Sequence, residues 1–227
     1  MRKILMIVGA VVIVLVVGAV AVWYFVLKSD PEPRTEIEET PVVEGGPIDG
    51  TYAVQPGGTD SFVGYRVQEQ FAGAVVESTA TGRTSDVEGT LTVSNGGLSV
   101  DEVEVTANLT TLTSDREMRD ARIRTLGLES EMFPEATFVL TRPMETDTAP
   151  KRGETVNATA IGDFTLHGVT KRVRIPVEGR WDGRSVQVVG NLPIVFADYG
   201  MDAPNIGGFV SVRDEGEMEF QLFFREA

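Results

Sequence analysis

Between residues 155 and 177, apolar and polar side chains alternate along the chain. A period of two is typical of a β-strand with one buried face and one face in water. The pair His167-Gly168 interrupts the alternation once, and a glycine-containing turn between two such runs predicts an antiparallel hairpin. The apolar parity of the two runs consists of Ala158, Ala160, Phe164 and Leu166, followed by Val173, Ile175 and Val177.

The same alternation returns in short runs over most of residues 51–227. Asn95-Gly96 and Asp182-Gly183, pairs that favour tight hairpin turns, separate some of these runs. Many short strands at hairpin spacing predict an all-β sandwich or barrel. The last run places four apolar side chains on one parity, namely Met218, Phe220, Leu222 and Phe224.

One stretch, residues 114–127, breaks the alternation and has helical features. Ser114 and Glu117 match a capping box, Met118 and Leu126 fit a loose helical spacing, and Gly127 can end a helix. We therefore expect one short helix within the β-domain.

A long apolar run follows the positively charged start of the chain. Residues 4–27 contain no ionisable side chain except Tyr24. A bilayer-spanning helix needs about 20 apolar residues, whereas a signal-peptide core is usually about half that length. We expect residues 1–28 to form an uncleaved transmembrane signal-anchor, while the Ala-Val-Ala sequence at 19–21 leaves cleavage open. Arg2 and Lys3 favour an amino terminus inside the cell. The protein would then be single-pass in the cell membrane, with its β-domain on the extracytoplasmic side.

The next stretch has the composition of a linker. Residues 29–50 are rich in Pro, Glu and Thr and nearly free of large apolar side chains. Such a segment buries too little surface to offset its ordering entropy, so we expect a disordered, solvated tether. The expected organisation is an anchor at 1–28, an acidic linker at 29–50 and a β-domain at 51–227.

Composition limits the chemistry that this chain can perform. The formal net charge of −14 argues against nucleic-acid binding, which relies on Lys and Arg at the phosphates. The chain has no cysteine and a single histidine, His167, and it lacks the short motifs of hydrolases, nucleotide-binding loops and metal sites. We therefore expect no catalytic residues, no metal, no cofactor and no enzymatic activity.

Residues 162–177, GDFTLHGVTKRVRIPV, resemble the signature of the YceI family. Residues 119–120, 133–138 and 196–201 resemble further motifs of that family, in the expected order. The resemblance implies a lipocalin-like antiparallel β-barrel of about eight strands, which carries a polyisoprenoid or similar long-chain lipid. Many members have a histidine after the first long strand, where this chain has Glu69, so a role tied to that histidine is not carried over.

The apolar parity of the strands defines the side chains that would line the barrel interior. Small residues such as Ala160 either accommodate a bulky neighbour in a filled core or leave an open lumen, and barrels of about eight strands lie at that margin. The residues alone do not decide, and the resemblance favours a cavity that binds ligand. The expected lumen residues are Phe138, Leu140, Ala158, Ala160, Phe164, Leu166, Val173, Ile175, Val188, Leu192, Phe220 and Leu222.

Two polar residues are candidates for contact with a lipid head group at the barrel mouth, Arg119 and His167. Each has a simpler interpretation. His167 can instead fix the hairpin turn by hydrogen-bonding a neighbouring loop. Arg119 belongs to a basic helix that can be a solvated face, or it can supply a guanidinium to a phosphate.

Two functions remain open from the sequence. The first is a non-enzymatic carrier that buries a long apolar chain in the barrel and is held near its lipid by the membrane anchor. The second is a cell-envelope scaffold or interaction domain whose barrel is filled by its own side chains. A homodimer is compatible with either function.

Overall fold

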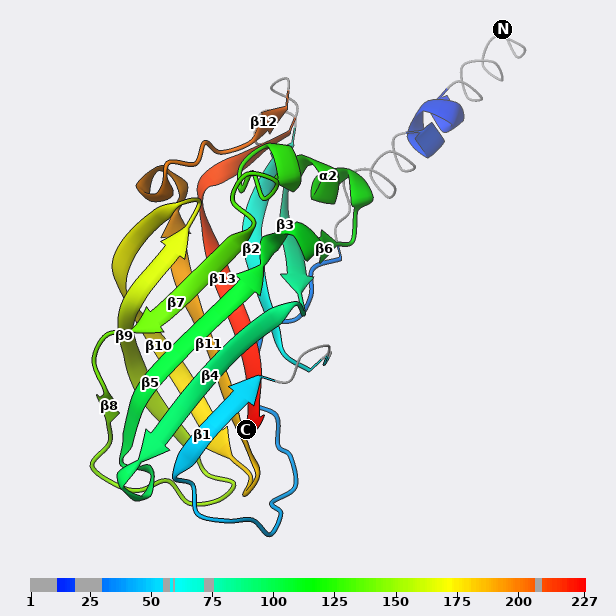
Figure 1. Cartoon of the computed structure of the whole chain (residues 1–227). Helices are drawn as coiled ribbons and strands as arrows, with labels where there is room; N and C mark the ends of the chain where they lie inside the picture. The colour runs from blue at the N-terminus through cyan, green and yellow to red at the C-terminus, as the bar shows by residue number, and fades with distance from the viewer. Residues whose placement is uncertain (1–11, 19–29, 55–57, 59, 72–75, 207–209) are drawn as a thin grey trace, which may run out of the picture.

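Most of the chain forms a closed antiparallel β-barrel, as expected (Figure 1). Strand β13 pairs with both β11 and β1, and the second pairing closes the ring. The structure is a computed structural model, and it describes residues 12–18, 30–54, 58, 60–71, 76–206 and 210–227. In hydrogen-bonded order the eight barrel strands are β1 (Gly50–Val54), β4 (Val87–Ser94), β5 (Ser99–Asn108), β7 (Glu135–Leu140), β9 (Thr155–Leu166), β10 (Val169–Trp181), β11 (Ser185–Val195) and β13 (Val210–Glu226).

Strands β2, β3 and β6 extend the sheet beyond the barrel. β13 is long enough for its free edge to pair with β1 near its carboxyl end and with β2 along the rest. β2 (Phe62–Phe71) then continues to β3 (Val76–Thr84) and β6 (Thr113–Ser114). Two short strands, β8 (Met144–Glu145) and β12 (Asn205–Ile206), pair with β5 and β13. The described residues also form the 3-10 turns η2 (Asn95–Gly97), η3 (Leu109–Thr111) and η4 (Phe196–Tyr199).

The hairpin predicted around His167-Gly168 is confirmed. β9 and β10 pair continuously from Leu166↔Val169 to Thr155↔Arg180. Both turn residues have positive φ, 52° at His167 and 72° at Gly168, which suits the two-residue turns that match strand twist. The even residues of β9 and the odd residues of β10 are the more buried ones, so the predicted parity holds.

The helix is shorter than the sequence predicts, and the capping box is wrong. α2 comprises Glu117–Thr125, and its N-cap is Arg116, whose side chain makes no capping hydrogen bond. Ser114 lies instead in β6, where its hydroxyl donates to Asp120 Oδ1 at 2.6 Å and accepts from the Arg116 N–H at 3.2 Å. Strand pairing with Gly82 keeps Ser114 outside the helix, and its hydroxyl joins β6 to α2.

Most of the expected anchor, residues 1–11 and 19–28, lies outside the described residues. Residues 12–18 are helical. Within the described part of the chain, no helix combines the length and the apolar character needed to cross a bilayer.

Residues 30–49, where the sequence predicts a solvated tether, lie along the outside of the barrel, and we call them the strap (the blue trace in Figure 1). The strap has no regular secondary structure, and most of its side chains are exposed. Its backbone is nevertheless bonded to the barrel along its length. The Glu32 N–H donates to Thr81 Oγ1, the Glu38 N–H to Gln187 Oε1, and the Val43 N–H to the Asp182 carbonyl.

The strap covers polar side chains on the outer face of the barrel. Glu219, only 2% exposed, accepts from Arg66 Nη2 at 3.2 Å and from Arg83 Nη2 at 3.1 Å. The same two nitrogens donate to the carbonyls of Glu32 and Pro33 in the strap. An outward carboxylate is therefore buried with its partners already in place, as buried charges require.

Candidate functional site

The barrel interior holds a narrow apolar cavity of about 90 Å³. All of its lining side chains except Thr137 are apolar. Seven of the twelve expected lumen residues line it, namely Phe138, Ala160, Phe164, Ile175, Val188, Phe220 and Leu222. Leu166 lines a second cavity, and Leu140, Val173 and Leu192 pack with the core. Ala158 also packs against the core, but it borders a groove outside the barrel as well. The inward orientation is as expected, and contact with a ligand stays a prediction.

Two inward glycines explain how aromatic rings fit in this interior. A Cβ placed on Gly162 would lie 2.4 Å from the Phe138 ring, and one on Gly190 would lie 2.7 Å from the Phe220 ring. Each ring therefore lies against the wall over a glycine of the adjacent strand, rather than across the centre of the barrel. The small side chain of Ala160 lines the cavity beside these rings.

Two further cavities continue from the lumen to the α2 end of the barrel. The second, of about 70 Å³, shares the wall residues Phe164 and Met218 with the first. The third, of about 220 Å³, lies under α2 and shares Tyr65 and Phe196 with the second. We call this third space the mouth cavity. The three spaces form a mostly apolar series from the mouth to the centre of the barrel.

Tyr65 is the polar group between the mouth cavity and the lumen. Its hydroxyl oxygen is buried and has no hydrogen-bond partner in the part of the chain that the structure describes. Burial raises the pKa of the Tyr65 phenol, and the neighbouring Arg119 charge acts in the opposite direction. Ser114 is close enough to lower that pKa as well, but it does not meet hydrogen-bond geometry. The Tyr65 ring lies over Gly82, and its phenol is an unpartnered polar group in the wall that the mouth cavity and the second cavity share.

Arg119 joins α2 to β2 at the edge of the mouth cavity. Its Nε and Nη2 donate to the two carboxylate oxygens of Glu69 at 2.9 and 3.0 Å, and its Nη1 contacts Asp115. Burial alone lowers the pKa of Arg119, but the hydrogen bonds and charge of Glu69 outweigh it, and the pKa is raised. Glu69, the position that departs from the family pattern, therefore holds Arg119 in place. The guanidinium proposed for a head group already has protein carboxylates as partners.

His167 has the structural role considered above. Its Nδ1 lies 3.1 Å from the Tyr199 carbonyl oxygen, and its Nε2 lies 2.8 Å from Glu129 Oε2. Its ring packs against Phe133 with centroids 4.1 Å apart. The hairpin turn is thereby tied to η4 and to the turn after α2. Among the described residues, His167 is not in the wall of any of the three internal cavities.

A larger groove of about 560 Å³ lies outside the barrel, beside the strap. It is open to solvent, and its walls mix charged residues such as Arg34 and Glu217 with apolar ones. An apolar ligand gains most where water is excluded from all sides. The internal series is for this reason the better candidate site, in spite of its smaller volume.

Comparison with known proteins identifies the family. The model of the YceI-like domain matches residues 52–224, which is most of the chain. This chain belongs to the YceI-like family. YceI-like proteins are binding proteins and are generally non-catalytic. The matched residues include nearly all of the barrel strands, α2 and all residues that line the internal cavities.

Individual relatives agree with this assignment. Protein YceI of Escherichia coli is 30% identical over 132 residues, which is 58% of this chain and 62% of the relative. The same figures hold for Protein YceI of Salmonella newport. The chain thus spans less than two thirds of the length of these curated relatives.

Solved structures support the YceI-like fold. A polyisoprenoid binding domain from Saccharophagus degradans superposes with a TM-score of 0.59 at 20% identity, over 78% of this chain and 98% of that one. The YCEI protein of Campylobacter jejuni gives a TM-score of 0.51 at 15% identity, over 64% and 84%. At these identities the likeness shows the fold alone.

Proposed function

We propose that this protein is a non-enzymatic lipid carrier that holds a polyisoprenoid, or a similar long apolar chain, inside the barrel. The observation that carries the proposal is the apolar series of cavities, which runs from the mouth under α2 to the lumen beside Ala160. Membership of the YceI-like family and the likeness to a polyisoprenoid binding domain support it.

Hydrophobic transfer would supply most of the binding free energy. Each buried methylene contributes about 0.8 kcal/mol, so a long prenyl chain needs few polar contacts. Specificity would come from the polar groups near the mouth, where the unpartnered Tyr65 hydroxyl is available. Because the lumen cavity has only about 90 Å³, side chains such as Met218 have to move to admit a chain.

The proposal includes the membrane anchor at residues 1–28, which would hold the barrel on the extracytoplasmic side of the cell membrane. The length of the apolar run and the charged residues before it support this topology. An anchor suits a carrier, because the barrel then stays close to the lipid that it collects. Whether two copies associate stays a prediction.

The second candidate is an envelope scaffold with a filled barrel, and the small volume of the lumen cavity favours it. Native mass spectrometry of the full chain, released from mild detergent and followed by solvent extraction, separates the two functions. The carrier should show an added mass that extracts as an isoprenoid or another long-chain lipid. A bare protein mass in every preparation would favour the scaffold and contradict the carrier.

A further inference from the structure

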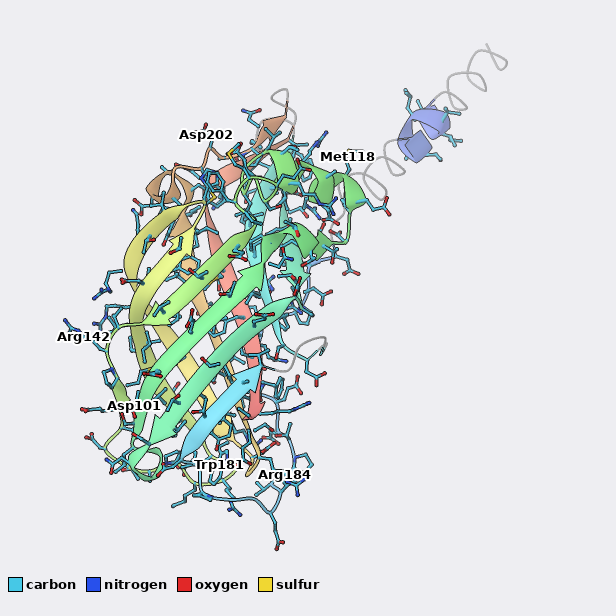
Figure 2. All side chains as sticks on the ribbon, in the orientation of Figure 1. Asp101, Met118, Arg142, Trp181, Arg184 and Asp202 are labelled. Carbon is cyan, nitrogen blue, oxygen red and sulfur yellow. The ribbon has the colours of Figure 1, made fainter. Side chains whose placement is uncertain are left out.

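The α2 end of the barrel exposes large apolar side chains. Met118 is 68% exposed, Leu126 51% and Met132 69%, and the three lie on α2 and the turn that follows it. Figure 2 shows Met118 at this end, far from Trp181 and Arg184 at the other. We call Met118, Arg122, Leu126 and Met132 the cap surface. Exposed apolar groups gathered in one place mark an interaction site more often than scattered ones do.

The mouth cavity opens through the cap surface. Met118, Arg122 and Leu126 are exposed or half-buried, and they also line that cavity. A partner that covers the cap surface would therefore also cover the entrance to the barrel. If the partner were the polar surface of a soluble protein, an apolar ligand could not enter the barrel through it.

The strap begins at this same end. The Asp30 N–H donates to Asp115 Oδ2 at 3.2 Å, two residues before α2 begins. The apolar run ends at Leu27, and three residues of extended chain span about 10 Å. From Asp30 the strap leads away to the opposite end, where Val43 bonds to Asp182. The strap thus begins beside α2, three residues after the apolar run ends in the sequence.

The charge of the cap surface fits a bilayer surface. Arg122 has no ion-pair partner within the described part of the chain, and its long side chain can reach lipid phosphates while its methylenes stay with apolar neighbours. Glu117, Glu129 and Glu131 lie nearby, so the attraction to anionic lipid is modest. Insertion of the exposed Met and Leu side chains would supply the larger share of the attachment.

We propose that the cap surface docks on the bilayer that holds the anchor, so that the mouth cavity faces the lipid. The inference rests on the anchored carrier proposed above and adds an orientation to it. The strap sets this orientation. Asp30, at its start, bonds to Asp115 beside α2, so only a few residues separate the anchor from this contact. A ligand would then pass from the bilayer into the barrel without crossing water.

The absence of cysteine from the sequence allows a direct test with the full chain. The variants Met118→Cys and, as a control at the opposite end, Arg184→Cys would each carry a bimane label. They would be reconstituted in nanodiscs of phosphatidylcholine and phosphatidylglycerol that contain doxyl-labelled lipid. Docking predicts at least twofold stronger quenching at position 118 than at position 184. Equal quenching at both positions, or quenching only at 184, would overturn it.

A second variant keeps the test separate from folding and from the carrier function. Leu126→Ser with Met132→Ser, in the Met118→Cys background, should reduce the quenching at 118 while the β-sheet circular dichroism signal is unchanged. Unchanged quenching would contradict docking. Lipid co-purification is measured on the same samples: bound lipid without quenching at 118 overturns docking and leaves the carrier standing. Quenching without bound lipid supports docking and contradicts the carrier.

Discussion

At the scale of single residues, Ala160 is where an open lumen and a filled core predict different results. It is 5% exposed and lines the lumen cavity. We expect Ala160→Phe to abolish lipid co-purification, because the new ring occupies the path of the ligand. The loss of stability should stay near the lower end of the roughly 1–3 kcal/mol typical of overpacking, since the ring enters an existing cavity.

The matched control is Thr159→Phe, on the outward face of the same strand. Its lipid content should equal that of the wild type. Mass spectrometry for bound lipid and thermal unfolding measure both effects. A filled core would be shown by two results together: Ala160→Phe lowers the unfolding free energy by several kcal/mol, and the wild type carries no lipid.

Glu219 gives a second prediction at this scale. Its carboxylate pairs with Arg66 and Arg83, and its side chain is 3% exposed. Glu219→Ala leaves the Arg66 guanidinium beneath the strap without its anion and Arg83 with only the exposed Glu32, so we expect a loss of about 3–5 kcal/mol in unfolding free energy. Denaturant unfolding measures the loss. Glu215→Ala, at an exposed position of the same strand, should change stability little, and equal losses in both variants would contradict the buried-charge interpretation.

Residue roles could be predicted only in part from the sequence. Inward parity was readable for Phe164 and Ile175, because it follows from a period of two. The partners of His167 were not readable, because Tyr199 and Glu129 lie 32 and 38 residues away and meet it only in the folded barrel. The pairing of Arg119 with Glu69 was missed for the same reason, although Glu69 was visible as a departure from the family pattern.

At the scale of elements, the link between α2 and β6 depends on Ser114. Its hydroxyl donates to the buried Asp120 carboxylate, and hydrogen bonds to charged groups contribute about 1.5–3 kcal/mol. We expect Ser114→Ala to lower the unfolding free energy by that amount, measured by thermal melts of the full chain in detergent. Thr113→Ala, at an exposed neighbour in β6, should leave the midpoint unchanged. No shift at Ser114 would mean that α2 is held by its other contacts alone.

The strap should loosen in acid. Hydrogen bonds and charge from Arg34 lower the pKa of Glu217 below its ordinary value of 4.5. Because folding lowers this pKa, the contribution to stability is present above pH 4.5 and is lost as the pH falls through the lowered value. The Asn191 side-chain amide also donates to Glu217, so its NMR shift should titrate with a midpoint below 4.5. In Arg34→Gln the midpoint should rise toward 4.5, and identical midpoints would contradict the strap contact.

The strap shows what composition cannot predict about an element. Its Pro- and Glu-rich sequence correctly indicates that it has little apolar surface of its own. Its attachment depends instead on backbone groups, which meet polar side chains such as Gln187 and Arg180 on the outer face of the barrel. Backbone donors and acceptors are the same in every sequence, so no residue pattern marks them.

At the scale of the whole molecule, the all-β class and the hairpins followed from local alternation, whereas barrel closure did not. Closure joins β1 to β13, through pairs such as Val54↔Phe224 that are far apart in the chain. Alternation predicts which face of each strand is buried, but it does not predict which strand pairs with it in the barrel. One edge of β13 pairs with β1 near its carboxyl end and with β2 along the rest. This division depends on how the strands assemble, so the sequence of β13 does not predict it.

The central claim is that an isoprenoid chain lies inside the barrel, and photo-crosslinking tests it most directly. A long-chain isoprenoid with a diazirine near the end of its tail would be bound to the full chain, irradiated, and located by peptide mass spectrometry. The claim predicts crosslinks to inward residues of β7, β9 and β13 around Ala160, and unlabelled isoprenoid should abolish them by competition. Crosslinks confined to the strap or the outer groove, or crosslinks that competition does not reduce, would contradict it.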